Sequence, residues 1–219
     1  MIITYQGVEF FKVQFGETVI AFNPISKESK HKTSRFGANI ALITAQHPDL
    51  NGADQASIGD KAPFVISGPG EYEVRDIFIR GYLSSSMYGL SDGIKPLINT
   101  IYTLTVDNMR ICFLGALGTT ELSPETKAAF DDIDILFVPI GGQGVLDPAE
   151  AYKFAVKLEP KIIIPMHFDE KGGLGDKGAL KTFLKEGDAT GVKGIDKLTV
   201  KRKDLEGKEG EIVVLDAQV

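Results

Sequence analysis

The chain has 219 residues, which is long enough to bury a substantial hydrophobic core. Hydrophobic residues make up 43% and charged residues 25%, values typical of soluble globular proteins and not of disordered, collagen-like or coiled-coil chains. The net charge of -6 is scattered and forms no basic stripe, so nucleic acid is not favoured as a partner. No apolar run approaches the ~20 residues of a membrane span, and no signal peptide is evident. We therefore expect a soluble, cytoplasmic protein.

Short β-rich runs fill the first half of the chain. Gly16-Glu17 lies between two such runs and predicts a tight hairpin turn. The lone cysteine, Cys112, lies in an apolar run and is expected to be a core residue and not a reactive thiol. Leu83–Gly93 is rich in glycine and serine and is expected to be a connection. The strands expected in this half are Glu9–Phe15, Thr18–Phe22, Ile40–Thr44, Phe64–Ser67, Ile77–Tyr82, Thr100–Val106 and Arg110–Leu114.

The second half contains the helices and the most apolar strands. Ile133–Pro139 and Lys161–Pro165 are continuous apolar runs, as expected for strands that are buried on both faces. Asp147 is followed by proline and by a glutamate three residues on, which is typical of a helix N-terminus. The helices expected are Ala151–Leu158, Ala179–Lys185 and one that opens at Ser123 and ends near Phe130, and the last expected strands are Leu198–Lys203 and Glu211–Asp216. We predict one domain over residues 1–219, an α/β (α+β) layered sandwich and not a doubly wound sheet.

Three histidines are present, and two of them stand at informative positions. His31 lies among lysines and serines in Ser26–Arg35, so we predict a solvated loop position without a functional role. His47 and His167 each follow a predicted buried strand, where α/β folds present ligands and catalytic groups. The pair is therefore a candidate for metal binding or acid–base chemistry. The alternative is that each imidazole hydrogen-bonds a backbone carbonyl in a tight loop.

The surroundings of these histidines resemble a known family. Thr44-Ala-Gln-His-Pro-Asp-Leu-Asn51 is similar to the Thr-His-x-His-x-Asp-His loop of the metallo-β-lactamase superfamily. The resemblance continues in order through Phe22–Pro24, Gly68–Val74, Cys112–Thr119, Pro139–Gly142 and Glu159–His167. It covers about residues 2 to 168, and several of these segments are similar to a bacterial branch of predicted Zn-dependent hydrolases related to ascorbate-6-phosphate lactonase. The resemblance implies a four-layer αββα sandwich.

The resemblance also implies seven ligand positions for two zinc ions. They are Ala45, His47 and Thr119 for the first ion, Asp49, Leu50 and His167 for the second, and Ala116 for the bridging carboxylate. A catalytic zinc needs about three protein ligands and an open position for water. Alanine and leucine offer no lone pair, and a neutral threonine hydroxyl is a poor zinc ligand. We therefore predict that the two-zinc site is disabled and that no cofactor is bound.

This interpretation favours a non-catalytic or binding homologue of metal-dependent hydrolases, a pseudoenzyme. Its pocket would be lined by His47, Asp49, Ala116, Thr119 and His167, with an unknown small molecule or protein as partner and self-association as a further possibility. The alternative is a weak hydrolase of phosphodiesters, lactones or β-lactams. In that case either one weakly bound Zn or Mn sits on His47, Asp49 and His167, or one of the two imidazoles acts as general base. Without metal, Asp49 and His167 are expected to form a charge-assisted hydrogen bond.

Overall fold

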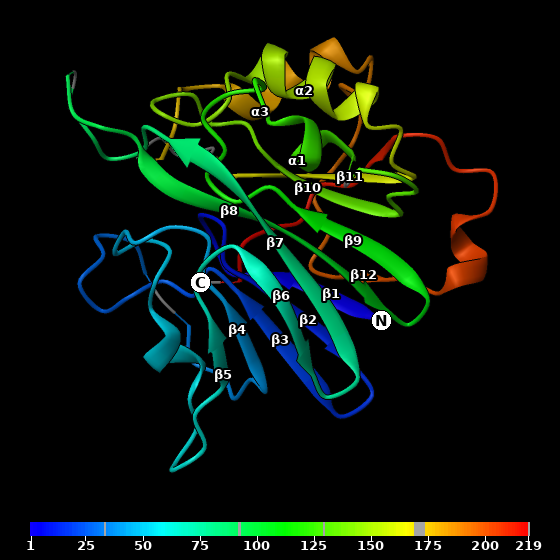
Figure 1. Cartoon of the computed structure of the whole chain (residues 1–219). Helices are drawn as coiled ribbons and strands as arrows, with labels where there is room; N and C mark the ends of the chain where they lie inside the picture. The colour runs from blue at the N-terminus through cyan, green and yellow to red at the C-terminus, as the bar shows by residue number, and fades with distance from the viewer. Residues whose placement is uncertain (33, 92, 129, 169–173, 219) are drawn as a thin grey trace.

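Two β-sheets packed face to face form the body of the protein (Figure 1). The computed structural model describes residues 1–32, 34–91, 93–128, 130–168 and 174–218. The first sheet has the strand order β12-β1-β2-β3-β4-β5. Its strands are β1 (Ile2–Tyr5), β2 (Phe11–Phe15), β3 (Thr18–Phe22), β4 (Ile40–Leu42), β5 (Phe64–Ile66) and β12 (Leu198–Thr199). The strands from β12 to β3 are antiparallel, whereas β3, β4 and β5 run parallel.

The second sheet has the strand order β13-β11-β10-β9-β8-β7-β6. Its strands are β6 (Gly70–Val74), β7 (Ile77–Ser86), β8 (Leu97–Val106), β9 (Met109–Phe113), β10 (Ile135–Pro139), β11 (Ile162–Met166) and β13 (Glu211–Ile212). The strands from β6 to β9 are antiparallel, and those from β9 to β13 are parallel. β10 and β11 are buried at every position, as their apolar runs predict.

The helices gather on one side of the sandwich. α1 (Pro124–Ala128), α2 (Pro148–Lys157) and α3 (Ala179–Glu186) lie over the second sheet (Figure 1). Asp147 caps α2 by accepting hydrogen bonds from the backbone amides of Ala149 and Glu150, as its sequence predicts. In the described chain, the only helical segment between β4 and β5 is the 3-10 turn η1 (Ala53–Ala56). The layered sandwich is therefore confirmed, but the predicted fourth layer is reduced to irregular chain and one turn.

Aromatic side chains fill the space between the sheets. Phe11 and Phe22 from the first sheet pack against Phe113 and Phe137 from the second, with ring centroids 4.6 Å apart for Phe22 and Phe113 and 4.8 Å for Phe11 and Phe137. All four are fully buried, and each contributes about 1.5–3 kcal/mol of burial free energy. This core fixes the ends of the strands from which the histidine loops emerge.

The structure corrects several predicted boundaries. β1 was not predicted, and β7 and β8 are longer than expected because their pairing continues to Ser86 and Leu97. The predicted strand Leu198–Lys203 is regular only over β12, since Asp204 caps the 3-10 turn η2 (Arg202–Leu205). In the described part of the chain, no helix is long and apolar enough to cross a membrane.

Candidate functional site

The histidine loops meet at one edge of the sandwich. His47 and Asp49 follow β4, His167 follows β11, and Tyr88 comes from the connection between β7 and β8. Glu9 precedes β2 and reaches the same place. The expectation that His47, Asp49 and His167 lie in one region is met, but Tyr88 and Glu9 change what that region can do.

His167 forms a buried pair with Glu9. Its Nδ1 lies 2.6 Å from Glu9 Oε1, and both side chains are completely inaccessible to solvent. Glu9 also accepts a 2.7 Å hydrogen bond from Asn23 Nδ2, which donates in addition to Thr44 Oγ1. A carboxylate at Nδ1 places the proton there and leaves Nε2 as an acceptor. His167 Nε2 is buried and has no hydrogen-bond partner in the described structure.

The ring of Tyr88 stands between the two histidines. Its centroid lies 4.7 Å from that of His47 and 4.4 Å from that of His167, the second contact being edge-to-face at 89°. The Tyr88 hydroxyl continues to Asp49 and donates to Oδ2 at 2.6 Å. Burial, followed by this hydrogen bond, raises the pKa of Tyr88, so the phenol stays protonated and acts as the donor. The Tyr88 ring therefore packs against both imidazoles.

Asp49 has hydrogen-bond donors on both oxygens. Ser29 Oγ donates to Oδ1, and Tyr88 donates to Oδ2. Burial opposes ionisation of Asp49, but the hydrogen bonds from Ser29 and Tyr88 and the nearby His47 outweigh it and hold the pKa of Asp49 below its ordinary value. The sequence predicted a hydrogen bond between Asp49 and His167, and this prediction is wrong. Tyr88 donates a hydrogen bond to Asp49, and Glu9 pairs with His167.

His47 is held in a form that accepts through Nδ1. The backbone amide of Asp49 donates to this nitrogen at 3.3 Å, and Asp49 Oδ2 lies 3.5 Å away. Burial lowers the pKa of His47, an effect that Asp49 opposes and His167 reinforces. Near Nε2, a Cβ added at Gly89 would lie 2.5 Å from the nitrogen, and Gly89 has a φ of +71°. The backbone of the Tyr88 loop therefore closes over the nitrogen that would face a ligand.

The four positions that lack a ligand side chain have other roles. Ala45, Leu50 and Ala116 are buried in one apolar cluster, at 3%, 0% and 0% exposure. Thr119 lies at a turn, where its hydroxyl accepts a 3.1 Å hydrogen bond from the amide of Glu121. The three apolar side chains supply no donor atom for a cation, and the neutral hydroxyl of Thr119 already accepts a hydrogen bond.

The residues present therefore do not fit a two-zinc centre. Each oxygen of Asp49 already accepts a hydrogen bond, from Ser29 or from Tyr88, and His47 Nδ1 accepts an amide hydrogen where a ligand bound through Nε2 would need a proton. His167 Nε2 has no hydrogen-bond partner among the described residues, but the ring that carries it packs against Tyr88 at a centroid distance of 4.4 Å. Within the described residues, no group of three or more His, Cys, Asp and Glu side chains is arranged to hold a metal ion.

Sequence reasoning misplaced one residue of the site and missed three. His31 was predicted to be a solvated loop residue; its side chain is 27% exposed, but its Nε2 lies 3.8 Å from Asp49 Oδ2, a contact that was not predicted. Ser29 and Tyr88 carried no signal beyond their loops. Glu9 did carry one, because a glutamate between Val8 and two phenylalanines must find a partner when that stretch is buried.

Comparison with known proteins agrees with the fold. The model of the family described as "Beta-lactamase superfamily domain" matches residues 2–167. A UPF0173 metal-dependent hydrolase of Carboxydothermus hydrogenoformans is 25% identical over 212 residues, covering 81% of this chain and 92% of the relative. A UPF0173 protein of Pyrococcus abyssi is 39% identical, but only over 70 residues, 32% of this chain and 31% of that protein.

Solved structures give the same picture. A crystal structure from Thermotoga maritima, described as a candidate Zn-dependent hydrolase of the metallo-β-lactamase superfamily, superposes with a TM-score of 0.76 at 27% identity and covers 99% of both chains. A candidate metal-dependent hydrolase from Parabacteroides distasonis has a TM-score of 0.62 at 21% identity, covering 99% of this chain and 93% of that one. By its sequence match and its two-sheet architecture, the chain belongs to the metallo-β-lactamase superfamily, among relatives named as metal-dependent hydrolases.

Proposed function

We propose that this protein is a non-catalytic member of its hydrolase family, retained as a binding module. The observation that carries the proposal is the Tyr88 ring between His47 and His167, with its hydroxyl bound to Asp49. The hydrolytic chemistry of such a site depends on a metal that lowers the pKa of bound water to about 7. Here a neutral phenol takes the place between the donors, so hydroxide is not generated at neutral pH.

The apolar cluster behind the site supports the same proposal. Two cations at van der Waals distance from Ala45, Leu50 and Ala116 would lose hydration without gaining ligands. In place of metal ions, the hydrogen bonds from Tyr88 and Ser29 to Asp49 stabilise the loops that carry these residues. What remains is a stable fold with a filled centre.

Metal content tests the proposal directly. Protein purified without added metal is expected to contain well under one zinc per chain by elemental analysis, and calorimetric titration with Zn²⁺ is expected to show no stoichiometric site. Two tightly bound ions per chain in the unmodified protein would overturn the proposal.

Reinstated ligands provide the matched comparison. We expect the variant Ala45→His, Leu50→His, Ala116→Asp, Thr119→His to bind about two zinc ions only when Tyr88→Gly is added, because the ring otherwise occupies the site. Circular dichroism on each variant separates failure to bind from failure to fold. Equal zinc uptake with and without Tyr88 would show that the ring is no obstacle.

A weak hydrolase is the second candidate, and one observation favours it. His167 Nε2 is unpartnered, and Glu9 on Nδ1 orients the ring as a carboxylate orients a metal-binding histidine. This candidate predicts hydrolysis of a phosphodiester, lactone or β-lactam that increases with Zn²⁺ or Mn²⁺ and is lost in His47→Ala, His167→Ala protein. Activity that survives the double substitution belongs to a contaminant or to another site.

A further inference from the structure

A pocket lies at the opposite end of β4 from His47. Its volume is about 770 Å³, within the range of sites that hold small molecules. Asn39, which lines it, directly precedes β4, whereas His47 follows that strand, so the strand separates the two places.

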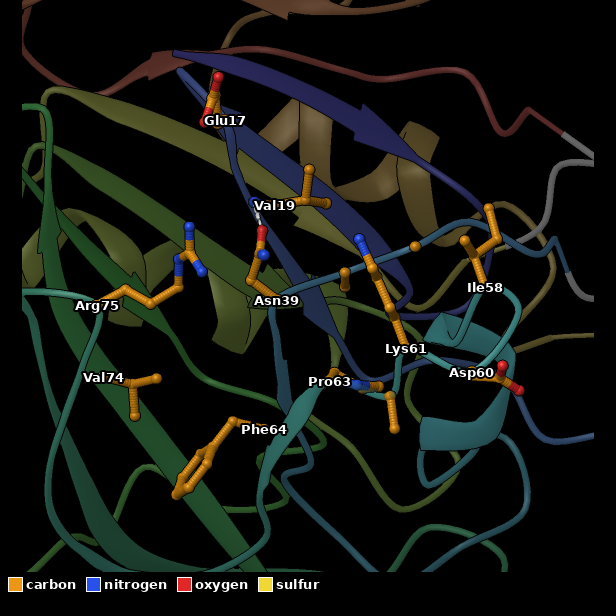
Figure 2. Close-up of a pocket in the computed structure, with 13 residues that line it drawn as sticks. Glu17, Val19, Asn39, Ile58, Asp60, Lys61, Pro63, Phe64, Val74 and Arg75 are labelled. Atoms are coloured by element: carbon orange, nitrogen blue, oxygen red, sulfur yellow. Dashed lines mark hydrogen bonds between the residues drawn. The ribbon is translucent and has the colours of Figure 1, made fainter.

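Three hydrogen-bond donors face this pocket. Figure 2 shows Arg75 and Lys61 reaching toward Asn39 from opposite sides. Asn39 Oδ1 accepts the backbone amide of Val19 at 2.8 Å, which orients the carboxamide and leaves Nδ2 as its outward group. Among the described residues, neither cation forms an ion pair, and Nδ2 donates to none of them. The guanidinium, the ammonium and the amide therefore have no acceptor among the described residues, although two carboxylates, Glu17 and Asp60, also line the pocket.

The turns that carry the two cations are well defined. Ile58 and Lys61 exchange backbone hydrogen bonds of 3.1 Å in each direction, which fixes the start of the Lys61 side chain. Arg75 and Asp76 form the tip of the β6–β7 hairpin with φ values of +54° and +60°. Asparagine or glycine suits such a turn position better than arginine. Arg75 therefore occupies a turn position that the backbone preference of arginine disfavours.

Apolar side chains surround these donors. Val19 and Val74 line the pocket beside Phe64 and Ile58, which remain 56% and 58% exposed. Phe64 lies on β5, the edge strand of the first sheet. Figure 2 shows the carboxylate of Asp60 turned away from the centre of the pocket, and Glu17 apart from both cations. Three grouped donors beside apolar side chains, with both carboxylates set apart from them, suit a ligand with an oxygen anion at one end and a hydrocarbon body at the other.

We propose that this pocket binds a small amphipathic oxyanion, a carboxylate or phosphate monoester carried on an apolar chain. Arg75, Lys61 and Asn39 receive the anionic oxygens, because a guanidinium binds them in a bidentate way and an ammonium adds a point charge. Val19, Phe64 and Val74 contact the hydrocarbon. The site is independent of the filled centre at the other end and requires no metal.

Titration of the isotope-labelled full chain tests the proposal. Decanoate and decyl phosphate, kept below their micelle concentrations, are expected to cause saturable amide shifts at Asn39, Lys61 and Arg75 in NMR spectra. Comparison of the two ligands tells which headgroup the site takes. Decanol and decylamine share the chain but lack the anion, and we expect at least about tenfold weaker binding for both, since they cannot accept from two cations.

Substitutions identify the groups responsible. Arg75→Asn suits the turn and removes the guanidinium, and Lys61→Gln removes the ammonium; each is expected to weaken binding about fivefold, as befits partly exposed charges. Lys153→Gln on α2, far from the pocket in sequence and outside its lining, is the matched control and should leave affinity unchanged. Absence of saturable shifts with both anions, equal binding of decylamine, or unchanged affinity in the double variant would overturn the proposal.

Discussion

Replacement of Tyr88 by phenylalanine removes one oxygen atom from the filled centre and keeps the ring between the histidines. The lost hydrogen bond is 2.6 Å long and ends on Asp49, whose side chain is 10% exposed and whose pKa is held below its ordinary value, so that it is ionised at neutral pH. Hydrogen bonds to charged groups contribute about 1.5–3 kcal/mol. Because Ser29 still donates to the other oxygen of Asp49, we expect a loss of about 2 kcal/mol in the free energy of unfolding.

Urea unfolding with a metal chelator present measures this loss. A change of 1 kcal/mol shifts the melting temperature of a chain of this size by about 2–4 °C, so Tyr88→Phe is expected to lower it by about 4–8 °C. A double-mutant cycle with Asp49→Asn isolates the interaction, since the two substitutions together should cost less than their sum.

Tyr152→Phe is the matched control. The Tyr152 ring packs against Phe183, and its hydroxyl has no hydrogen-bond partner in the described structure, so its loss is expected to change stability by less than about 0.5 kcal/mol. If Tyr88→Phe is no more destabilising than this control, Tyr88 does not bind Asp49 in solution, and the argument for a filled centre loses its main support.

Further predictions concern charge and reactivity. Burial lowers the pKa of His47 from 6.5, so below pH 6.5 the unfolded chain binds a proton more readily than the folded chain does. The free energy of unfolding should therefore fall as the pH drops from 6.5. Urea titrations of His47→Gln should show a weaker dependence on pH. Asp49, whose pKa is also lowered, should add a further loss below pH 3.8, absent in Asp49→Asn. Glu9→Gln should lower the free energy of unfolding by about 3–5 kcal/mol in the same assay, because the amide NH₂ of glutamine would face a donor, either His167 Nδ1 or Asn23 Nδ2. A loss under about 1 kcal/mol would contradict the buried pair. Burial raises the pKa of the Cys112 thiol, so a disulfide reagent should label it only in unfolded protein, and rapid labelling of the native state would contradict its core position.

Most of the fold could be predicted from the sequence because its signals are local. The apolar runs of β10 and β11 and the cap at Asp147 depend on neighbours along the chain, and their positions are confirmed to within a few residues. Short strands near the sheet edges were harder to predict. β1 is only four residues long and is stabilised by pairing with β2 and with β12, nearly 200 residues later.

The candidate site was also predicted only in part. The resemblance of the Thr44–Asn51 loop identified His47 and Asp49, and both lie at the predicted edge of the sandwich. It could not identify Tyr88, because one aromatic residue in a glycine- and serine-rich connection gives no indication of which neighbour it contacts. The pairing of His167 with Glu9 spans 158 positions and depends on tertiary packing alone. Whether the remaining ligand positions hold a metal stays a prediction.

The last strands have a consequence for how the protein is made. β12 pairs with β1 and β13 pairs with β11, so each sheet receives its final strand from beyond residue 197. A ribosome must therefore release almost the whole polypeptide before either sheet is complete, and until then the outer edges of β1 and β11 lack a neighbour. Such non-local closure slows folding and exposes strand edges to other nascent chains. Removal of the last twenty residues should therefore lower the soluble yield far more than the short length of β13 would suggest.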